Sequence, residues 1–450
     1  MRLASGDADP ERVDLPARVA RKLTWRILPF VMLLYFVSFL DRVNVGFAAL
    51  SMNQAIGLTP TTFGLGGGIF FFGYFLFEVP SNLILNKVGA RVWIARVMVT
   101  WGLVSAASAF VVGARSFYVL RFLLGVAEAG FFPGIILYLS QWFPARQRAV
   151  AAAAFMAAAP LSTAIGSPIS GALMAMPTMA GLSNWQWLFI IEAIPAIVLG
   201  FVVLKVLTDS PEKAAWLATD EKAWLVATLR EESKNRQSQA GHAEGAWRAM
   251  RDPRVLVMSL VYFGTSAGLY TLGLWAPLII RQFGFSALGV GALNAIPSAV
   301  AVIGMIAWAR HSDRTSERTW HVVIPCVAAS LGLAFAGNAH TALQVVLALV
   351  IVNLGVSAAK APLWAIPSSF LSGAGAAAGI AMINSVGNLG GFVGPFAIGW
   401  LKSRTGSYEG GLYVVAAALA VSALLTLSIG RRTSRIRDAN ATAAVEEQEK

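Results

Sequence analysis

Apolar residues run along the chain in stretches of about twenty positions, separated by short polar intervals. A helix of about 20 apolar residues crosses a hydrocarbon core of about 30 Å. Such stretches recur over the whole length and number twelve: 27–47, 61–85, 93–112, 116–139, 149–175, 187–207, 255–280, 287–309, 321–337, 342–364, 376–400 and 411–430. The pattern therefore predicts an all-α integral membrane protein with twelve transmembrane helices.

The longest polar interval divides the twelve predicted helices into six and six. It has helix-like apolar spacing, which predicts an amphipathic helix, at Trp216, Leu217, Trp224, Leu225 and Leu229. That helix either lies at the membrane surface or packs its aromatic side chains on neighbouring parts of the chain. The predicted organisation is a cytoplasmic tail, a six-helix bundle, a cytoplasmic linker, a second six-helix bundle and a cytoplasmic tail: 1–26, 27–207, 208–254, 255–430 and 431–450.

One shift of 227 positions relates the two halves. Identical pairs at this shift include Gly57/Gly284, Gly64/Gly291, Arg91/Arg318, Trp93/Trp320 and Pro168/Pro395. Each pair is weak alone, but a shared offset indicates an ancestral duplication. Two pseudo-symmetric six-helix halves are an architecture of transporters, in which the substrate site lies between the halves near mid-membrane.

Basic residues are unevenly distributed between the two sides of the predicted membrane. The chain is 57% hydrophobic and 13% charged, with a formal net charge of +12. Counted from a cytoplasmic N-terminus, 28 of the 35 Lys and Arg fall on the cytoplasmic side and four on the other. This is the positive-inside pattern, so we expect a multi-pass protein of the inner (plasma) membrane with both termini cytoplasmic. The charge reports topology rather than a nucleic-acid partner.

Residue types that build metal or catalytic centres are sparse and scattered. The one cysteine, Cys326, lies in an apolar run, and the four histidines lie in loops or near helix ends without metal-ligand spacing. No phosphate-binding loop of the GxxxxGKS or GxxxxGKT form is present. We therefore expect no metal, no cofactor and no enzymatic activity.

Four charged residues lie well inside the first and fourth predicted helices: Asp41, Arg42, Arg121 and Glu128. A charge at the centre of a membrane helix costs about 2.5–3.5 kcal/mol on insertion scales, so each is a functional candidate. Adjacent helical positions point about 100° apart, which sends Asp41 and Arg42 to different partners. Arg121 and Glu128 are seven positions apart and share one helix face.

These four residues suggest a binding and coupling site. We expect the two arginines to hold an anionic substrate, because a guanidinium matches a carboxylate with two donors. Glu128 and Asp41 would then bind and release protons. The alternative is a buried ion-pair network that locks the two helices together. The second half lacks these charges at the 227 shift, which favours function over a lock needed by each half.

Polar residues of the other helices complete the predicted cavity. Asn384 and Asn388 are one helical turn apart and suit substrate hydroxyl or carboxyl groups, or equally hydrogen bonds between helices. Tyr74, Trp364 and Ser368 are further candidates for the lining. Two acids, Glu78 and Glu192, are expected to act in gating or packing.

Several segments resemble the anion:cation symporter family of the major facilitator superfamily, which contains bacterial organic-acid transporters. The similarity extends over about residues 25–430 and is carried by LDRVNVGFAAL, YFLFEVPSNLIL, KVGARVWIAR, RFLLGVAEAGFFPGIILYLSQWFP, WQWLFIIEAIPA, SPEKAAWL, ARHSDRTSER and AAAGIAMINSVGNLGGFVGPFAIGWL.

The resemblance implies proton-coupled uptake of an organic anion by alternating access in a monomeric protein. It implies protonation at Asp41 and Glu128, and substrate contacts from Arg42, Arg121, Tyr74, Ser368 and Asn388. The chain looks most like carriers of tartrate-like hydroxy acids and of aromatic acids such as phthalate. The expected partners are this anion, protons and the lipid bilayer. An exchanger that swaps organic anions without protons is the alternative.

The resemblance also implies gate contacts on the cytoplasmic side. The matching residues are Lys87 and Arg91 in the first half and Asp313 and Arg314 in the second. Lys360 stands near the inner end of the tenth helix, where a small residue is expected. Its side chain either extends to the interface or adds a second positive site for a doubly charged substrate.

Overall fold

The computed structural model describes residues 10–239, 248–367, 370–371 and 373–448. Within these ranges the chain is helical apart from short connections and one β-bridge between Met179 and Leu182. The elements are α1 (Pro10–Ala55), α2 (Pro60–Val88), α3 (Ala90–Ala107), η1 (Ser108–Phe110), α4 (Ala114–Glu128), α5 (Phe131–Trp142), α6 (Ala145–Met174), α7 (Asn184–Val206), η2 (Pro211–Lys213), α8 (Thr219–Gln239), α10 (Pro253–Arg281), α11 (Ala287–Thr315), α12 (Thr319–Gly337), α13 (Ala342–Ala365), α14 (Gly373–Asn388), α15 (Gly390–Thr405) and α16 (Glu409–Gln448).

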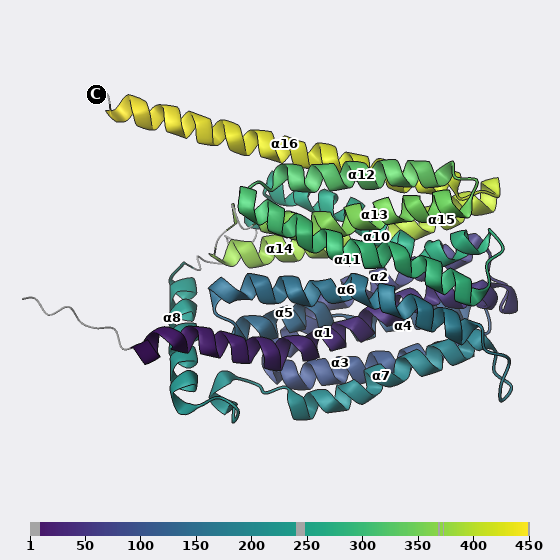
Figure 1. Ribbon diagram of the computed structural model, residues 1–450, viewed down its shortest axis with the longest axis horizontal. Coiled ribbons are helices and arrows are strands. Elements are labelled where there is room, and N and C mark those ends of the chain that lie inside the picture. Colours follow the sequence, from purple (N-terminus) through teal and green to yellow (C-terminus); the bar gives the residue numbers. More distant parts are fainter. Residues whose placement is uncertain (1–9, 240–247, 368–369, 372, 449–450) are drawn as a thin grey trace, which may run out of the picture.

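The helices form twelve crossings. In the described chain, eleven segments are long and apolar enough to cross a membrane, and one of these joins α4 and α5 over Ala114–Trp142. The remaining crossing is α14 with α15, which Leu389 divides into two helices of 16 residues each. Six crossings precede α8 and six follow it, in two bundles that lie side by side (Figure 1). The twelve-helix prediction is therefore confirmed.

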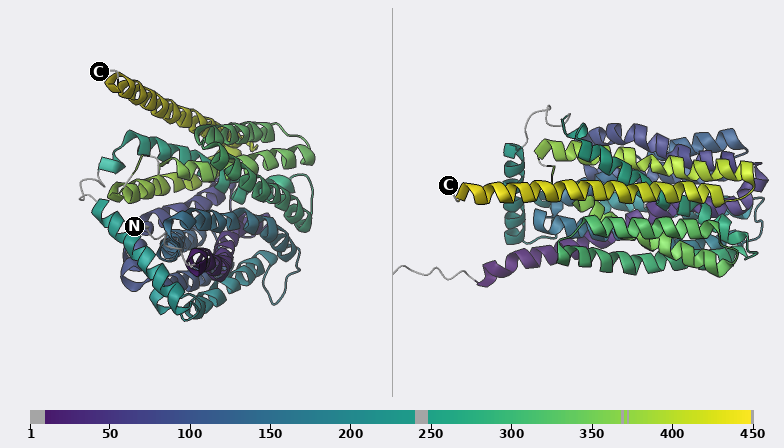
Figure 2. Two further views of the ribbon diagram at one scale, coloured as in Figure 1. Left: turned by 60° about the vertical axis from the view of Figure 1, so that its left-hand side comes forward. Right: turned by 90° about the horizontal axis from the view of Figure 1, so that it is seen from above.

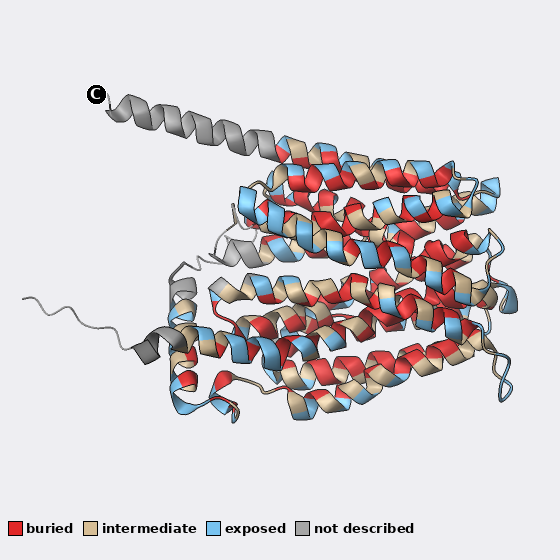
Figure 3. Ribbon diagram, in the orientation of Figure 1, coloured by how far each residue is buried: buried red, intermediate tan, exposed pale blue. Residues whose placement is uncertain are grey.

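Both ends of the described chain lie at one end of the bundle. α1 begins there, α16 ends there, and α8 lies across it (Figures 1 and 2). We call this the linker end and the opposite one the far end. Large apolar side chains such as Ile303 (73% exposed) and Leu331 (65%) remain uncovered along the outer faces, while buried residues face inward (Figure 3). Exposed apolar flanks on helices of this length suit lipid as the surrounding solvent.

The two halves have glycines at equivalent positions, after their first helix and at a close helix contact. Gly57 follows α1 with φ +67°, and Gly284 follows α10 with φ +82°. A left-handed conformation favours glycine in both loops. At the far end, a Cβ on Gly64 would lie 2.7 Å from the Pro395 carbonyl oxygen, and one on Gly291 would lie 2.5 Å from the Ser167 carbonyl oxygen.

These two close approaches are related by the duplication. Gly64 corresponds to Gly291 at the 227 shift, and Ser167 directly precedes Pro168, the counterpart of Pro395. They join α2 to α15 and α6 to α11, so each half meets the other through an equivalent pair of helices. The predicted pseudo-symmetry of the halves is therefore visible in their contacts at the far end.

The segment between the halves packs on the first bundle through its apolar side chains. The Trp216 ring stacks on Trp142 of α5, with centroids 5.5 Å apart and planes 16° from parallel. Leu217 and Leu225 are buried in the same core. The amphipathic face of this segment therefore contacts protein, which is one of the two alternatives that the spacing left open.

Glu221 attaches α8 to the extension of α1 at the linker end. Its buried carboxylate accepts hydrogen bonds from Arg18 Nε at 3.0 Å, Lys22 Nζ at 2.7 Å and the Ala218 amide at 3.0 Å. Burial acts to raise the pKa of Glu221, but the hydrogen bonds from Lys22 and Ala218 and the charges of Lys22 and Arg18 outweigh it and lower the pKa. Docking of α8 is therefore stabilised by the ionised carboxylate.

Replacing Glu221 with glutamine should weaken this docking by about 1–2 kcal/mol, because the partners of the lost carboxylate are partly exposed and screened. The stabilisation should be complete above the ordinary glutamate pKa and should be lost as the pH falls through the lowered pKa. The measurement is the rate of limited proteolysis within residues 208–254 as a function of pH. Asp220→Asn is the matched control, since Asp220 is 54% exposed and pairs only with Arg18. Equal rates for both variants would remove Glu221 from this role.

Candidate functional site

An ion pair joins the two charged helices of the first half. Arg42 Nε of α1 donates to Glu128 Oε2 of α4 at 2.8 Å, and both side chains are buried. Arg42 Nη1 also donates to the Tyr270 hydroxyl at 3.3 Å. Because Tyr270 lies on α10, the first helix of the second half, the pair lies at the interface between the bundles. A polar contact therefore links the charged cluster of one half to the other half.

A break in the fourth crossing fixes the position of Glu128. α4 ends at Glu128 and α5 begins at Phe131, with Gly130 between them at φ +89°. A side chain on Gly130 would collide with Ser81, whose hydroxyl donates to the Ala129 carbonyl at 2.6 Å. The interrupted backbone thus has its freed carbonyl satisfied by α2. The sequence places a proton-binding candidate at the last turn of a helix inside the membrane.

An aromatic surface from α2 lies beneath both arginines. The Arg42 guanidinium carbon lies 5.5 Å from the Phe70 ring centroid and 5.3 Å from that of Tyr74. The Arg121 guanidinium carbon lies 5.0 Å from Phe70. Ring faces attract cations at these separations. Tyr74, predicted to line the cavity, therefore contacts Arg42, which is predicted to bind the substrate. Phe70 contacts both arginines and so lies between the two cations.

Arg121 is a buried cation without a countercharge in contact. It is 4% exposed, and in the described part of the chain no hydrogen bond or ion pair reaches its guanidinium. Glu128, the acid on its own helix face, bonds Arg42 instead. A buried charge is normally paired, because desolvation costs several kcal/mol per ion. The arrangement is therefore suited to an anion that arrives from outside the chain.

Two further polar atoms of the cluster have no partner among the described residues. Glu128 Oε1 and Arg42 Nη2 are both buried and make no hydrogen bond. A carboxyl oxygen in this position is able to carry a proton, and a guanidinium nitrogen is able to donate to a ligand carboxylate. The cluster therefore has unused capacity for both a proton and an anion.

Asp41 is held separately by its own half. Its carboxylate accepts from Trp101 Nε1 at 2.8 Å, Ser105 Oγ at 2.8 Å and Asn44 Nδ2 at 3.3 Å. It makes no ion pair with Arg42 within the described residues, as the different directions of adjacent helical positions require. Three donors stabilise a carboxylate, so Asp41 is better satisfied than Glu128. Glu128, by contrast, keeps one carboxyl oxygen without a hydrogen bond among the described residues.

The predicted asparagines lie on the second half, opposite α2. Asn384 Nδ2 donates to Glu78 Oε1 at 2.5 Å, and Ser385 Oγ donates to Glu78 Oε2 at 3.2 Å. These bonds connect α14 to α2 and thus cross the interface between the bundles. Glu78, expected to act in gating or packing, is a contact between the halves in this conformation. Asn388 is buried at the end of α14, next to the break at Leu389.

Trp364, a further lining candidate, lies nearer the linker end. The Trp364 ring of α13 meets the Tyr262 ring of α10 edge-on, with centroids 5.0 Å apart. Ser368 lies outside the described residues. No contact within the described chain joins Trp364 to the arginines, so its place in a substrate site stays a prediction.

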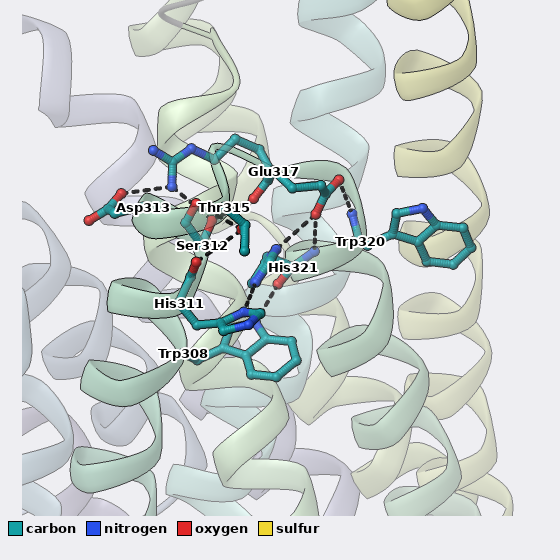
Figure 4. Close-up of polar contacts among 9 residues, drawn as sticks. Trp308, His311, Ser312, Asp313, Thr315, Glu317, Trp320 and His321 are labelled. Atoms are coloured by element: carbon teal, nitrogen blue, oxygen red, sulfur yellow. Dashed lines mark hydrogen bonds and ion pairs between the residues drawn. The ribbon is translucent and has the colours of Figure 1, made fainter.

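The predicted gate residues contact their own halves. Arg91 pairs with Asp209 at 3.1 Å and donates to the Leu204 carbonyl at 3.2 Å. Asp313 pairs with Arg318 at 2.7 Å in the turn between α11 and α12 (Figure 4). Lys87 and Arg314 are exposed. In this conformation these charges do not bridge the bundles, and their gating role stays a prediction.

A histidine cluster beside Asp313 has both ring nitrogens of His321 engaged by neighbours. His311 Nδ1 and His321 Nε2 are 2.7 Å apart, and His321 Nδ1 lies 2.8 Å from Glu317 Oε2 (Figure 4). The Trp308 indole donates to the His321 carbonyl at 2.9 Å. No group of three His, Cys, Asp or Glu side chains among the described residues is arranged to hold a metal ion. Glu317 also accepts from the Trp320 and His321 backbone amides, at 2.8 and 3.2 Å, so its carboxylate caps the start of α12.

Sequence reasoning missed four side chains that shape the site: Phe70, Trp101, Ser105 and Tyr270. Aromatic residues in apolar runs are ordinarily packing residues, so Phe70 and Tyr270 carried no signal of their own. Trp101 and Ser105 are four positions apart on α3 and therefore share a face. That polar pair within an apolar helix was the available sign that the third crossing faces a charged partner.

Known proteins with similar sequences are transporters. Residues 31–395 match the protein family described as "Major Facilitator Superfamily". An Agrobacterium vitis protein named "Putative tartrate transporter" is 65% identical over 94% of this chain and 93% of its own length. An Acinetobacter baumannii protein named "Quinolone resistance transporter" is 40% identical over 94% of this chain and 97% of its own length.

A solved structure shares the architecture. It is a bacterial homologue of the human lysosomal transporter Spinster in an inward-facing, unoccupied conformation, with a TM-score of 0.73 over 94% of this chain and 98% of that one. The identity is 16%, so this likeness concerns the fold alone.

Proposed function

The chain belongs to the major facilitator superfamily, and we propose that it is a secondary transporter that imports an organic anion together with protons. Its family and its relatives show that it is a transporter rather than an enzyme. The proposal of organic-anion import with protons rests mainly on one observation. Arg121 is a buried guanidinium without an ion pair in the described chain, beside the Arg42–Glu128 pair and at the interface of the two halves.

The geometry supports coupling through competition for Arg42. Glu128 occupies Arg42 Nε when it is ionised. Protonation removes the negative charge, weakens the ion pair and frees the guanidinium for a substrate carboxylate. Anion and proton then favour one another's binding, since each removes an obstacle for the other. Loss of both restores the Arg42–Glu128 pair, so the empty carrier carries no uncompensated acid back across the membrane.

The name of the A. vitis relative favours a carboxylate cargo such as a tartrate-like hydroxy acid, and aromatic acids such as phthalate are the other candidates. The 40% identical relative is named for quinolone resistance, so sequence likeness at that level does not fix the cargo. We propose the inner membrane as the location, with the linker end in the cytoplasm, on the distribution of Lys and Arg.

The proposal predicts that purified protein in liposomes accumulates tartrate against its gradient when the outside is made acidic. Collapse of the pH gradient with a protonophore should reduce accumulation to equilibration. The measurement is uptake of labelled tartrate with a pH gradient, without one, and with the internal lumen preloaded with unlabelled tartrate.

Exchange without protons gives a different result in the same liposomes. Uptake that depends only on preloaded anion, and is indifferent to the imposed gradient, would establish the exchanger and contradict symport. Absence of uptake for every hydroxy, sugar and aromatic acid tried would contradict the organic-anion proposal itself.

A further inference from the structure

A cavity lies between the two halves, beside the charged cluster. The gap between its walls amounts to about 570 Å³ only when adjoining open space is counted, and it is lined by α1 and α6 from the first half and by α10, α11 and α13 from the second. Phe39 and Val43 of its wall lie on either side of Arg42 along α1, and Leu269 directly precedes Tyr270. The cavity is therefore next to the residues that hold the Arg42–Glu128 pair.

Among the described residues, Lys360 is the one ionisable side chain in the lining of this cavity. It is partly buried on α13, and no hydrogen bond or ion pair joins it to another described residue. The two acids at the interface between the halves bond other residues, Glu128 bonding Arg42 and Glu78 bonding Asn384. Lys360 therefore lacks a protein countercharge.

Neutral hydrogen-bonding groups occupy the same face of α13. Asn353, Ser357 and Lys360 follow at intervals of four and three positions, which is one helix face. Asn353 Nδ2 donates to Ser298 Oγ of α11 at 3.0 Å, and Ser357 Oγ donates to Asn353 Oδ1 at 3.3 Å. Their remaining lone pairs and protons are suited to alcohol groups.

The charged groups of the first half and the lysine, amide and hydroxyl of the second lie on helices that the duplication relates. The 227 shift relates α13 to the α4–α5 crossing and places Lys360 opposite Pro133, Ser357 opposite Gly130 and Asn353 opposite Val126. The first half thus presents Arg121 and Glu128, while the second presents a lysine with an amide and a hydroxyl. Two unpaired cations from different halves with alcohol-binding groups beside one of them are complementary to an anion with two charges.

We propose that Lys360 is a second anion-binding group, which makes the site selective for organic dianions, preferably hydroxylated ones, over monoanions. One carboxylate binds the Arg42 and Arg121 guanidinium groups, and the other binds the Lys360 ammonium. The inference rests on the proposed transport of organic anions and defines which class of anion is carried. It also ties the two halves together through the substrate, because each end of the dianion is held by a different half.

The test uses full-length purified protein and four probes that separate charge from hydroxyl content: tartrate, glycerate, succinate and butyrate. Dissociation constants are measured by calorimetry for wild type, Lys360→Met and Lys360→Arg. Wild type should bind each dianion at least tenfold more tightly than the matching monoanion. Lys360→Met should lose about 10- to 100-fold for tartrate and succinate and change less than threefold for glycerate and butyrate. Lys360→Arg should retain the preference for dianions.

Lys402→Met is the matched control, because Lys402 lies at the end of α15 over the Tyr408 ring, outside the cavity. It should bind all four probes as wild type does. Equal losses of dianion and monoanion binding in Lys360→Met, or unchanged tartrate binding, would overturn the role of Lys360 while leaving the organic-anion proposal intact. Wild type that binds none of these acids, nor any other carboxylate, would overturn both.

Discussion

Glu128→Gln is expected to abolish accumulation driven by a pH gradient and to preserve exchange of labelled for unlabelled anion. Glutamine has the shape of glutamate and its amide oxygen still accepts a hydrogen bond from Arg42 Nε, so the link between α1 and α4 is retained. The side chain no longer ionises, so its negative charge no longer competes with the anion for the Arg42 guanidinium. Accumulation should fall at least tenfold to the level of equilibration, while counterflow should stay within about threefold of wild type.

The measurement for Glu128→Gln is paired uptake in liposomes with an imposed gradient and with preloaded substrate. Glu192→Gln is the control, because Glu192 is an equally buried acid that bonds Ser170 on the neighbouring helix rather than an arginine. It should accumulate substrate as wild type does. Normal accumulation by Glu128→Gln would remove this acid from coupling, and loss of both activities would indicate a structural role.

Arg121→Ala is expected to weaken binding of every carboxylate by about 30-fold or more, because removal of a charged partner from a buried site costs 2–5 kcal/mol. The stability of the ligand-free protein should be unchanged or higher, since the variant removes a buried cation that makes no ion pair in the described chain. Affinity is measured by calorimetry, and stability by thermal unfolding without ligand.

Arg42→Ala provides the contrast in the same measurements. It leaves Glu128 buried without its cation, so the ligand-free protein should lose about 3–5 kcal/mol of stability in addition to affinity. The hypothesis of a structural lock predicts instead that both arginine variants destabilise the protein alike. Unchanged affinity together with a lower unfolding temperature in Arg121→Ala would favour that hypothesis.

Helix geometry allowed part of this site to be predicted from the sequence. The 100° turn between neighbours separates the partners of Asp41 and Arg42, and the seven-residue spacing sets Arg121 and Glu128 on one face. These are local consequences of the backbone. The duplication was predictable for a similar reason, because a glycine needed after the first helix of one half is needed again in the other.

The choice of partners was not predictable in this way. Helix periodicity does not tell which arginine pairs with Glu128, because that depends on how α1 and α4 are displaced along each other. The break at Gly130, the donors from α3 to Asp41 and the approach of Tyr270 from the second half all follow from tertiary packing. For the same reason the sequence predicts one continuous helix over 376–400, whereas the structure divides this run of 25 positions at Leu389.

The glycine contacts at the far end also bear on how fast the protein changes conformation. Gly64 and Gly291 meet main-chain carbonyl oxygens, so these two contacts immobilise no side chain of the glycines, whereas ordering a long side chain costs up to about 1.5–2 kcal/mol in entropy. Opening this end likewise breaks no ion pair at these two contacts. These two contacts of backbone against backbone are thus inexpensive to form and to release, which suits a carrier that repeats the motion in every transport cycle.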